Sequence, residues 1–294
     1  MILLTGASGF LGRHLLRRLR AEFGDDDVVA LTSRPLPGVR CVLHQGHSYD
    51  PNAFADAGLG GITAIIHAGA FTPKSRQEAN WPGPSTRNVQ TTLHLLEARL
   101  PALEQIVYLS AVDVYRPGVG IDESTQPSPQ SLYGWSKLYS EKLVEAWAVD
   151  TERIAKVLRI GHVYGPGEEA YDKVIPSTFR RIRGGEPVLR FGTGQEQRSL
   201  IYVNDVVEVV VRSLKVRLNG PLNVVGQTPV DMRTLIDMIC RVAGHSGEVV
   251  EVSPGFTGHH FTFDARKVSE VLPQQTPLAE GLLAEWRALA ELHD

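Results

Sequence analysis

A tyrosine and a lysine stand four residues apart in the segment Y-G-W-S-K, which contains Tyr133 and Lys137. If this segment is helical, both side chains project from the same face, because residues four apart are neighbours on a helix. A tyrosine ordinarily has a pKa near ~10, and an adjacent ammonium group lowers that pKa by stabilising the phenolate. The pair therefore has the chemistry of a general acid/base that exchanges a proton near neutral pH.

Many surface helices carry this pair, so a second motif decides its interpretation. The chain opens with M-I-L-L-T-G-A-S-G-F-L-G, in which an apolar run typical of a buried strand leads into Gly6, Gly9 and Gly12. Gly6 permits a tight turn, Gly9 lets a pyrophosphate approach the backbone, and Gly12 lets the next helix pack closely on the sheet. The sequence therefore predicts a dinucleotide site at a strand-to-helix turn, with the helix N-terminus facing the phosphates.

The elements that must position these groups alternate along the chain. Short buried strands are expected at residues 1–5, 28–32, 39–44, 64–68, 105–110 and 154–160. Helical apolar spacing is found at residues 10–23, 85–98 and 132–148. This alternation predicts an α/β fold with a doubly wound parallel sheet of the Rossmann type and helices on both faces.

Beyond residue 160 the chain changes texture, with glycine- and proline-bearing segments between short elements. Residues 1–160 are expected to form a dinucleotide-binding domain, to which residues 199–225 return with strands at 199–203 and 222–225. Residues 161–198 and 226–294 are then expected to form a smaller, discontinuous C-terminal substrate lobe.

Composition narrows the class of protein. The chain has 294 residues, 43% of them hydrophobic, and a formal net charge of −3, so it can bury a large core and lacks a basic stripe for nucleic acid. Cys41 and Cys240 are isolated, without the spacing of a disulfide framework or a metal site. The first residues already form the expected first strand, and polar residues interrupt the apolar run at 201–211. We therefore expect a cytoplasmic protein with no membrane partner, no nucleic-acid partner and no bound metal.

The motifs resemble, in order and spacing, those of the extended short-chain dehydrogenases/reductases known as the NAD-dependent epimerase/dehydratase family, which act mostly on nucleotide sugars. The resemblance spans nearly the whole chain. It is carried by T-G-A-S-G-F-L-G at 5–12, H-A-G-A at 67–70, N-V-Q-T-T at 88–92, S-A-V-D-V-Y at 110–115, Y-G-W-S-K at 133–137, L-R-I-G-H-V-Y-G-P-G at 158–167 and R-S-L-I-Y-V-N-D-V at 198–206.

The resemblance implies a role for each matching residue. Tyr133 is then the catalytic acid/base, and Lys137 binds the nicotinamide ribose while lowering the pKa of Tyr133. Arg198 resembles the arginine that contacts nucleotide-sugar phosphate, and His162 stands where many relatives have an asparagine that touches these phosphates. Together with Tyr133 and Lys137, the expected cofactor contacts are Gly6, Ser8, Gly9, Phe10, Leu11, Gly12, Thr32, Ser33, Arg34, His67, Ala68 and Gly69.

Three positions depart from the family pattern, His162 among them. Ala111 aligns with the serine or threonine that hydrogen-bonds the reacting oxygen, and loss of such a donor lowers the rate by on the order of a hundredfold. Ser110 is expected to replace that hydroxyl in part, although neighbours in a strand normally point to opposite faces. Asp113 aligns with the glutamate base of the sugar 4,6-dehydratases, but Val112 stands in place of their acid, which weakens a dehydratase interpretation.

The choice of cofactor depends on the end of the second expected strand, which reads Thr32, Ser33, Arg34. It offers no carboxylate for a ribose hydroxyl and one guanidinium for a 2′-phosphate. His47 also replaces the aspartate that relatives often place near the adenine. We therefore expect NADP, with NAD as the alternative.

Exchangeable NADPH suits net reduction, so the expected reaction is hydride transfer to a keto group of a nucleotide sugar. The alternatives are an NDP-sugar epimerase with retained NAD, a reductase of a ketone without a nucleotide, and a weakly catalytic NADP-binding protein. The helices at 85–98 and 132–148 resemble the pair that joins relatives across a two-fold axis, so a homodimer is expected.

Overall fold

The computed structural model describes residues 1–44, 54, 57–169, 171–256 and 258–291. The chain forms two compact units, and each is described by itself. The first consists of Met1–Arg116, Gln126–Ile160 and Val207–Leu222, and the second of Pro117–Thr125, Gly161–Val206 and Asn223–Asp294.

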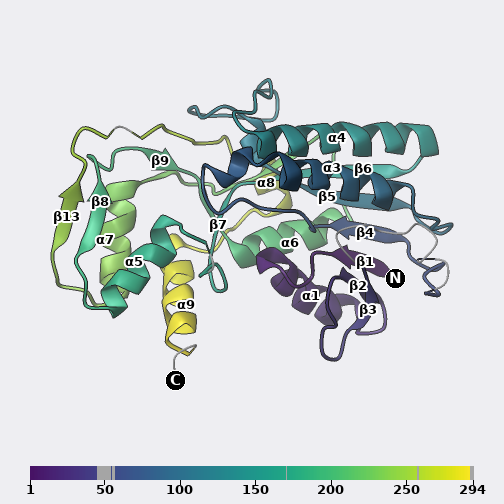
Figure 1. Ribbon diagram of the computed structural model, residues 1–294, viewed down its shortest axis with the longest axis horizontal. Helices are drawn as coiled ribbons and strands as arrows, with labels where there is room; N and C mark the ends of the chain where they lie inside the picture. The colour runs from purple at the N-terminus through teal and green to yellow at the C-terminus, as the bar shows by residue number, and fades with distance from the viewer. Residues whose placement is uncertain (45–53, 55–56, 170, 257, 292–294) are drawn as a thin grey trace. The chain divides into compact units, whose positions relative to one another are not determined.

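A seven-stranded sheet in the order β11-β6-β5-β4-β1-β2-β3 forms the centre of the first unit (Figure 1). Its strands are β1 (Ile2–Thr5), β2 (Val28–Thr32), β3 (Arg40–Leu43), β4 (Ala64–His67), β5 (Gln105–Ala111), β6 (Ile154–Ile160) and β11 (Leu222–Val224). Strands β1 to β6 pair in parallel with their neighbours. The strand order reverses between β1 and β4, and open α/β sheets bind ligands outside the carboxyl ends of the strands at such a point.

Helices cover both faces of this sheet. α3 (Pro82–Leu96) and α4 (Leu132–Thr151) lie against one face, and α1 (Phe10–Phe23) lies against the other (Figure 1). α3 begins at a proline, which suits the first position of a helix because the missing amide hydrogen has no partner there. α4 begins after Ser131, whose Oγ accepts a hydrogen bond from the Gly134 amide at 3.1 Å. Two short 3₁₀ turns, η1 (Glu78–Asn80) and η2 (Val112–Val114), precede these two helices.

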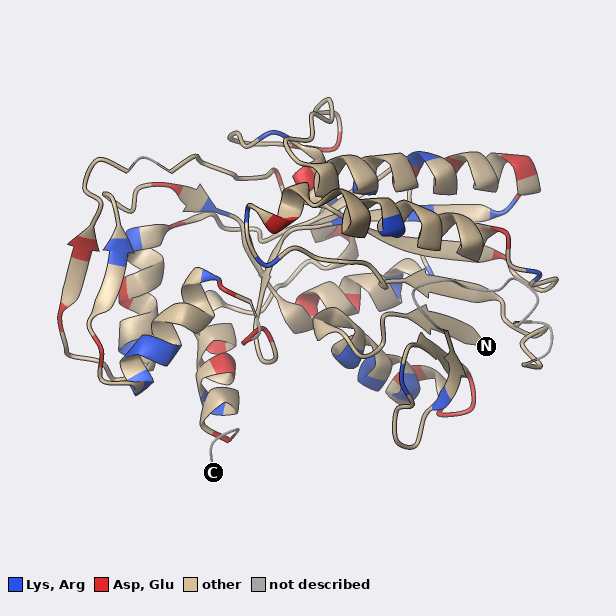
Figure 2. Cartoon of the chain, viewed as in Figure 1, with Lys and Arg blue, Asp and Glu red and all other residues tan. Residues whose placement is uncertain are grey.

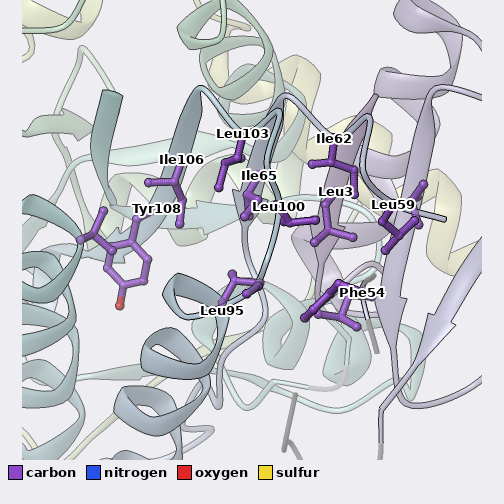
Figure 3. Packing of buried hydrophobic residues seen from close by; sticks show 14 of the residues in the cluster. Leu3, Phe54, Leu59, Ile62, Ile65, Leu95, Leu100, Leu103, Ile106 and Tyr108 are labelled. Atoms are coloured by element: carbon purple, nitrogen blue, oxygen red, sulfur yellow. The ribbon is translucent and has the colours of Figure 1, made fainter. Parts of the chain in front are cut away.

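The core of the first unit lies between the sheet and α3. Leu3, Ile65 and Ile106 come from three adjacent strands, and they pack with Tyr108 and with Leu95 of α3 (Figure 3). All five side chains are at most 1% exposed. Burial of such an aliphatic side chain contributes roughly 1.5–3 kcal/mol, which explains why the strands are nearly continuous apolar runs.

The second unit is built from three small sheets and several helices. The strand pairs are β7 (His162–Tyr164) with β10 (Leu200–Tyr202), β8 (Val188–Phe191) with β13 (Val249–Val252), and β9 (Gln197–Arg198) with β12 (Val230–Asp231). The helices are α5 (Val174–Arg183), α7 (Met232–Val242), α8 (Arg266–Val271) and α9 (Leu278–Glu291). α6 (Val203–Ser213) follows β10 directly and continues into the first unit.

The structure confirms the α/β fold class and most of the expected elements. The helix at 10–23 and the strands at 28–32 and 154–160 have the expected bounds. The expectation that residues 199–203 return to the large sheet is wrong, because β10 pairs with β7 in a sheet of its own. Its apolar pattern fits any sheet, so the pattern did not specify the partner.

Charged residues of both signs are distributed over the molecule (Figure 2). The basic run on α1 is partly neutralised, since Arg18 Nε lies 2.5 Å from Glu208 Oε1 and Arg18 Nη1 lies 3.0 Å from Glu22 Oε2. Among the described residues, the helices are too short or too polar to span a membrane.

Candidate active site

The glycine turn lies between β1 and α1, at the point where the strand order reverses. Gly6 has a φ of +71°, and a Cβ atom on it would lie 2.6 Å from the Cα atom of Gly69. A Cβ atom on Gly12 would overlap the carbonyl oxygen of Gly6. Ser8 and Gly9 complete the turn, and Phe10 and Leu11 begin α1. The turn is therefore closed at atomic distances, and only glycine fits its two tightest positions.

A buried hydrogen-bond network holds the segment after β4 against this turn. Thr5 Oγ1 accepts from the Gly69 amide at 2.7 Å and lies 2.8 Å from His67 Nδ1. His67 Nε2 lies 3.1 Å from Thr92 Oγ1, which in turn donates to the Asn88 carbonyl oxygen at 2.9 Å. Burial, with a contribution from the charge of Lys137, lowers the pKa of His67 to about 3, so the ring is neutral.

The donors in this network specify the tautomer of His67. Because Thr92 donates its only proton to the Asn88 carbonyl oxygen, Nε2 must donate to Thr92, and Nδ1 then accepts the proton of Thr5. The side chain of His67 is 2% exposed and is committed to supporting the glycine turn. Cofactor contacts from His67, Ala68 and Gly69 stay a prediction.

Tyr133 and Lys137 lie on one buried face of α4, and their side chains are 6% and 4% exposed. Lys137 Nζ donates to the carbonyl oxygen of Leu109 at 2.7 Å and lies 4.9 Å from the centre of the Tyr108 ring. Burial lowers the pKa of Lys137 to about 8, and the carboxylates of Glu141 and Asp113 oppose this shift. Near neutral pH the ammonium group is therefore present, held at the end of β5.

Ser110 belongs to a different set of contacts. Its Oγ donates to Glu141 Oε1 at 2.5 Å, and Glu141 also pairs with Arg159, whose Nη2 lies 2.7 Å from Oε2. Ser110 is 3% exposed, and Ala111 follows it in the strand at 6%. That Ser110 replaces the hydroxyl missing at Ala111 stays a prediction, and in the structure its hydrogen bond is donated to the buried carboxylate of Glu141.

Asp113 and Arg34 are both exposed residues of the first unit, although Val112 and Val114 on either side of Asp113 are buried. Asp113 lies in η2, and its carboxylate raises the pKa of Lys137. Arg34 follows β2, where its amide lies 3.5 Å from the Oγ1 atom of the buried Thr32, and Ser33 between them is exposed. His47 lies outside the described residues.

The second unit brings His162 and Arg198 together around Phe261. The rings of His162 and Phe261 are 5.3 Å apart in an edge-to-face arrangement, and the backbones of Arg198 and Phe261 form a β-bridge. Burial, together with the charges of Arg198 and Lys173, lowers the pKa of His162 to about 3. Arg198 Nη1 donates to the His259 carbonyl oxygen at 2.5 Å. A neutral imidazole and a half-buried guanidinium therefore lie close together.

The comparisons with known proteins agree with this geometry. Residues 2–226 match the NAD dependent epimerase/dehydratase family. The chain belongs to this family. As a member, it is an enzyme of the epimerase, dehydratase and reductase type that uses a nicotinamide cofactor.

Three relatives cover almost the whole chain. The chain is 30% identical to MoeE5, whose structure was solved in complex with UDP-glucose and NAD, with a TM-score of 0.85 over 100% of this chain and 99% of that one. It is 28% identical to the uncharacterized UDP-glucose epimerase YtcB of Bacillus subtilis (strain 168), over 99% of this chain and 98% of the relative. It is 27% identical to a dTDP-4-dehydro-6-deoxy-D-allose reductase of Streptomyces bikiniensis, over 97% of this chain and 95% of the relative.

The residues of the first unit fit the cofactor of this family. The turn at Gly6 and Gly12 leaves no room for side chains, and α1 has Gly9 as its N-cap and no acidic residue in its first turn, so its amide groups suit a pyrophosphate. The described residues contain no group of three or more metal-ligating side chains.

Sequence reasoning missed three residues of these arrangements. Glu141 stands four residues after Lys137, and this spacing was a usable signal, since it places both on one helix face. Phe261 and Lys173, which flank His162, come from segments distant in sequence, and no spacing links them to it.

Proposed function

We propose that the protein is an NAD(P)-dependent oxidoreductase that transfers hydride between the nicotinamide and a sugar carbon of a nucleotide sugar, with reduction of a keto sugar as the net reaction. The observation that carries this proposal is the placement of Lys137. Its buried ammonium lies on the same face of α4 as Tyr133 and donates to the Leu109 carbonyl oxygen of β5. Its charge acts on His67, which supports the glycine turn suited to a dinucleotide.

In the reducing direction, a nicotinamide held at the glycine turn would supply hydride to the carbonyl carbon of the keto sugar. The phenol of Tyr133 gives its proton to the carbonyl oxygen, which becomes the hydroxyl of the product. The phenolate left behind is stabilised by the ammonium of Lys137, because an opposite charge close to an ionised group favours its charged form. Solvent later returns the proton to Tyr133.

The environment of Ala111 limits the rate of this reaction. A methyl group at this position donates no hydrogen bond to an oxygen on which negative charge develops, and the hydroxyl of Ser110 is bound to Glu141. Asp113 is the second candidate for a group that acts on the substrate, because it is exposed and near Lys137. A weakly catalytic protein would lack the buried pair on α4.

Three arginines support NADP as the cofactor. A pocket of about 480 Å³ lies between α1 and the segment after β2, and its lining includes Arg13, Arg17 and the ion pair of Arg20 with Asp25. Arg34 lies in that same segment. Positive charge at these positions suits a 2′-phosphate, and the end of β2 carries no carboxylate for a ribose hydroxyl.

An NDP-sugar epimerase with retained NAD is the second candidate. It is favoured by the similarity to YtcB, which is named as a UDP-glucose epimerase, and to MoeE5, which was solved with NAD. The similarity to the Streptomyces reductase favours the first candidate to a comparable degree. Arg198 and His162 are the residues that we propose for contacts with the nucleotide phosphates in either case.

The assembly that we propose is a homodimer formed through α3 and α4. Leu93, Trp135 and Tyr139 are 40%, 55% and 57% exposed on these helices, and apolar surface of this kind favours a self-complementary contact.

Two free cysteines, Cys41 and Cys240, fit a reducing cytoplasm.

The test is a panel of keto sugars carrying different nucleotides and of simple ketones, each with NADPH and with NADH, followed by nicotinamide absorbance. Tyr133→Phe is expected to bind cofactor normally and to lose turnover by roughly a hundredfold or more. Conversion of an NDP-sugar to its epimer with NAD and no net absorbance change would establish the second candidate. If only ketones without a nucleotide are turned over, the assignment of a nucleotide-sugar substrate is wrong.

A further inference from the structure

Glu141 is a buried acid that the proposed mechanism does not use. It stands one helical turn after Lys137, so Tyr133, Lys137 and Glu141 follow one another along a single face of α4. The side chain of Glu141 is 0% exposed. A carboxylate in such a position is costly unless it is paired and hydrogen-bonded, so its partners indicate what it does.

The partners of Glu141 come from two strands of the first unit. Ser110 Oγ on β5 donates to Oε1 at 2.5 Å, and Arg159 on β6 donates from Nε to Oε1 at 3.0 Å and from Nη2 to Oε2 at 2.7 Å. Arg159 also donates from Nη1 to the hydroxyl of Tyr115 at 2.5 Å and lies 5.0 Å from the centre of that ring. The network therefore ties α4 to two adjacent strands of the large sheet.

We propose, resting on the function above, that Glu141 is a positioning residue that acts on Lys137 through its charge and on α4 through Ser110 and Arg159. Two consecutive residues of β5 hold the helix at points one turn apart. The Leu109 carbonyl oxygen binds Lys137, and the Ser110 hydroxyl binds Glu141. Two such hydrogen bonds fix both the position of α4 along the strand and its rotation about its own axis. A single hydrogen bond does not fix both.

The charges around Lys137 support the proposed electrostatic effect of Glu141 on the Lys137 ammonium. Burial lowers the pKa of Lys137 to about 8, and of the two carboxylates that oppose this shift Glu141 has the larger effect and Asp113 the smaller. The other groups that face Lys137 and Glu141 are neutral or already paired. His67 is uncharged because burial lowers its pKa to about 3, burial raises the pKa of Tyr108, and Arg159 is bound by Glu141. Without Glu141, the ammonium is expected to lose its proton at a lower pH.

The experiment neutralises the ion pair as a unit. Glu141→Gln alone leaves the charge of Arg159 buried without its partner, whereas Glu141→Gln with Arg159→Met removes both charges and is expected to fold. Nuclear magnetic resonance of isotope-labelled lysine follows the titration of Lys137 in the cofactor-free protein, with Lys137→Met to assign the signal. We expect the titration to move to lower pH by about one unit, and the alkaline limb of the pH–rate profile to move with it.

A matched control removes another ion pair of the same unit. Arg18→Met with Glu208→Gln breaks the pair between α1 and α6, and it is expected to leave the titration of Lys137 unchanged. If Lys137 titrates in the Glu141/Arg159 variant as it does in the wild type, the proposal is overturned. Because this measurement needs neither cofactor nor substrate, its result is independent of the proposed function, which fails instead if Tyr133→Phe keeps full turnover.

A double-mutant cycle separates positioning from direct catalysis by Ser110. Ser110→Ala is expected to lower turnover by roughly tenfold in the wild type and to have no further effect in the neutralised background, since both act through one network. A loss of on the order of a hundredfold in both backgrounds would make Ser110 a direct donor and would remove it from the network.

Glu141→Asp decides the question if the neutralised variant does not fold. It keeps the charge but shortens the side chain by one methylene group. The titration of Lys137 is then expected to match the wild type while turnover falls by roughly tenfold, because the contacts that hold α4 are lost. Wild-type turnover in Glu141→Asp would contradict the positioning role.

Discussion

Glu285→Gln is expected to change the pH dependence of stability of the second unit. Glu285 lies on α9 and Glu168 follows β7, and both side chains are 0% exposed. The carboxylate of Glu168 lies 2.9 Å from Lys173 Nζ, whereas Glu285 has no side-chain hydrogen-bond partner among the described residues. Burial and the nearby charge of Glu168 raise the pKa of Glu285 to about 9. At neutral pH Glu285 is therefore protonated, while burial also raises the pKa of Glu168 and Lys173 opposes that shift.

The magnitude follows from the difference between the folded and unfolded pKa values. The unfolded value is near 4.5, so folding takes up a proton between this pH and about 9. Below the unfolded pKa, Glu285 is protonated in both states and does not reduce stability. As the pH rises from the unfolded pKa toward the folded pKa, the free energy of unfolding falls by about 1.4 kcal/mol per pH unit. At neutral pH the cost is about 3 kcal/mol. Glutamine has the same shape and takes up no proton, and its unpartnered amide costs about 1–3 kcal/mol in return.

The assay is urea unfolding of the wild type and the variant at several values between about pH 6 and pH 8. We expect the free energy of unfolding to fall with pH in the wild type and to be much flatter in Glu285→Gln, so the two curves cross between about pH 5 and pH 7, where the wild-type cost equals that of the amide. Glu280→Gln, an exposed change on the same helix, is expected to keep the wild-type slope. Equal slopes in the wild type and in Glu285→Gln would refute the reasoning, because they would mean that Glu285 is ionised in the folded protein.

Three further changes test the candidate site and the assembly. Arg34→Ala is expected to weaken NADPH binding by roughly tenfold to a hundredfold in calorimetric titration and to leave NADH binding unchanged, since it removes one charge-assisted contact; tighter binding of NADH by the wild type would contradict the choice of NADP. Ala111→Ser is expected to raise turnover on the true substrate by roughly tenfold, and an unchanged rate would show that another group stabilises the oxygen. Light scattering is expected to give the mass of a dimer, and Trp135→Asp that of a monomer; a monomeric wild type would remove the proposed interface.

The elements that the sequence predicted well are those whose boundaries depend on local chemistry. α1 has the predicted bounds because a glycine turn precedes it and a glycine follows it at position 24. β2 was equally clear because it is a buried apolar run, and β6 has the predicted bounds although it contains Lys156 and Arg159. β10 was misassigned because the choice between two sheets is made by tertiary pairing, which three apolar residues do not encode.

In the candidate site, too, features set by local sequence were predicted and features set by tertiary contacts were not. The motifs located the glycine turn, and they located Tyr133 and Lys137, because residue type and spacing there are dictated by chemistry. They did not reveal that His67 is bonded at both nitrogen atoms, since Thr5 and Thr92 are distant from it in sequence. A histidine next to a cofactor motif is readily interpreted as a ligand contact, and only its burial and its two partners show the supporting role.

The alternation of Ser110 and Ala111 links the fold to the rate of the proposed reaction. Strand geometry required these neighbours to face opposite sides, but the hydrogen bond of Ser110 to Glu141, a partner 31 residues away, could not be predicted from the strand alone. With that hydroxyl engaged, stabilisation of the reacting oxygen rests on the proton of Tyr133 and hence on the charge of Lys137. A relative with a serine at position 111 would have a second donor to share this task. The chain described here is therefore expected to be more sensitive than such relatives to any change in Glu141 that displaces the titration of Lys137.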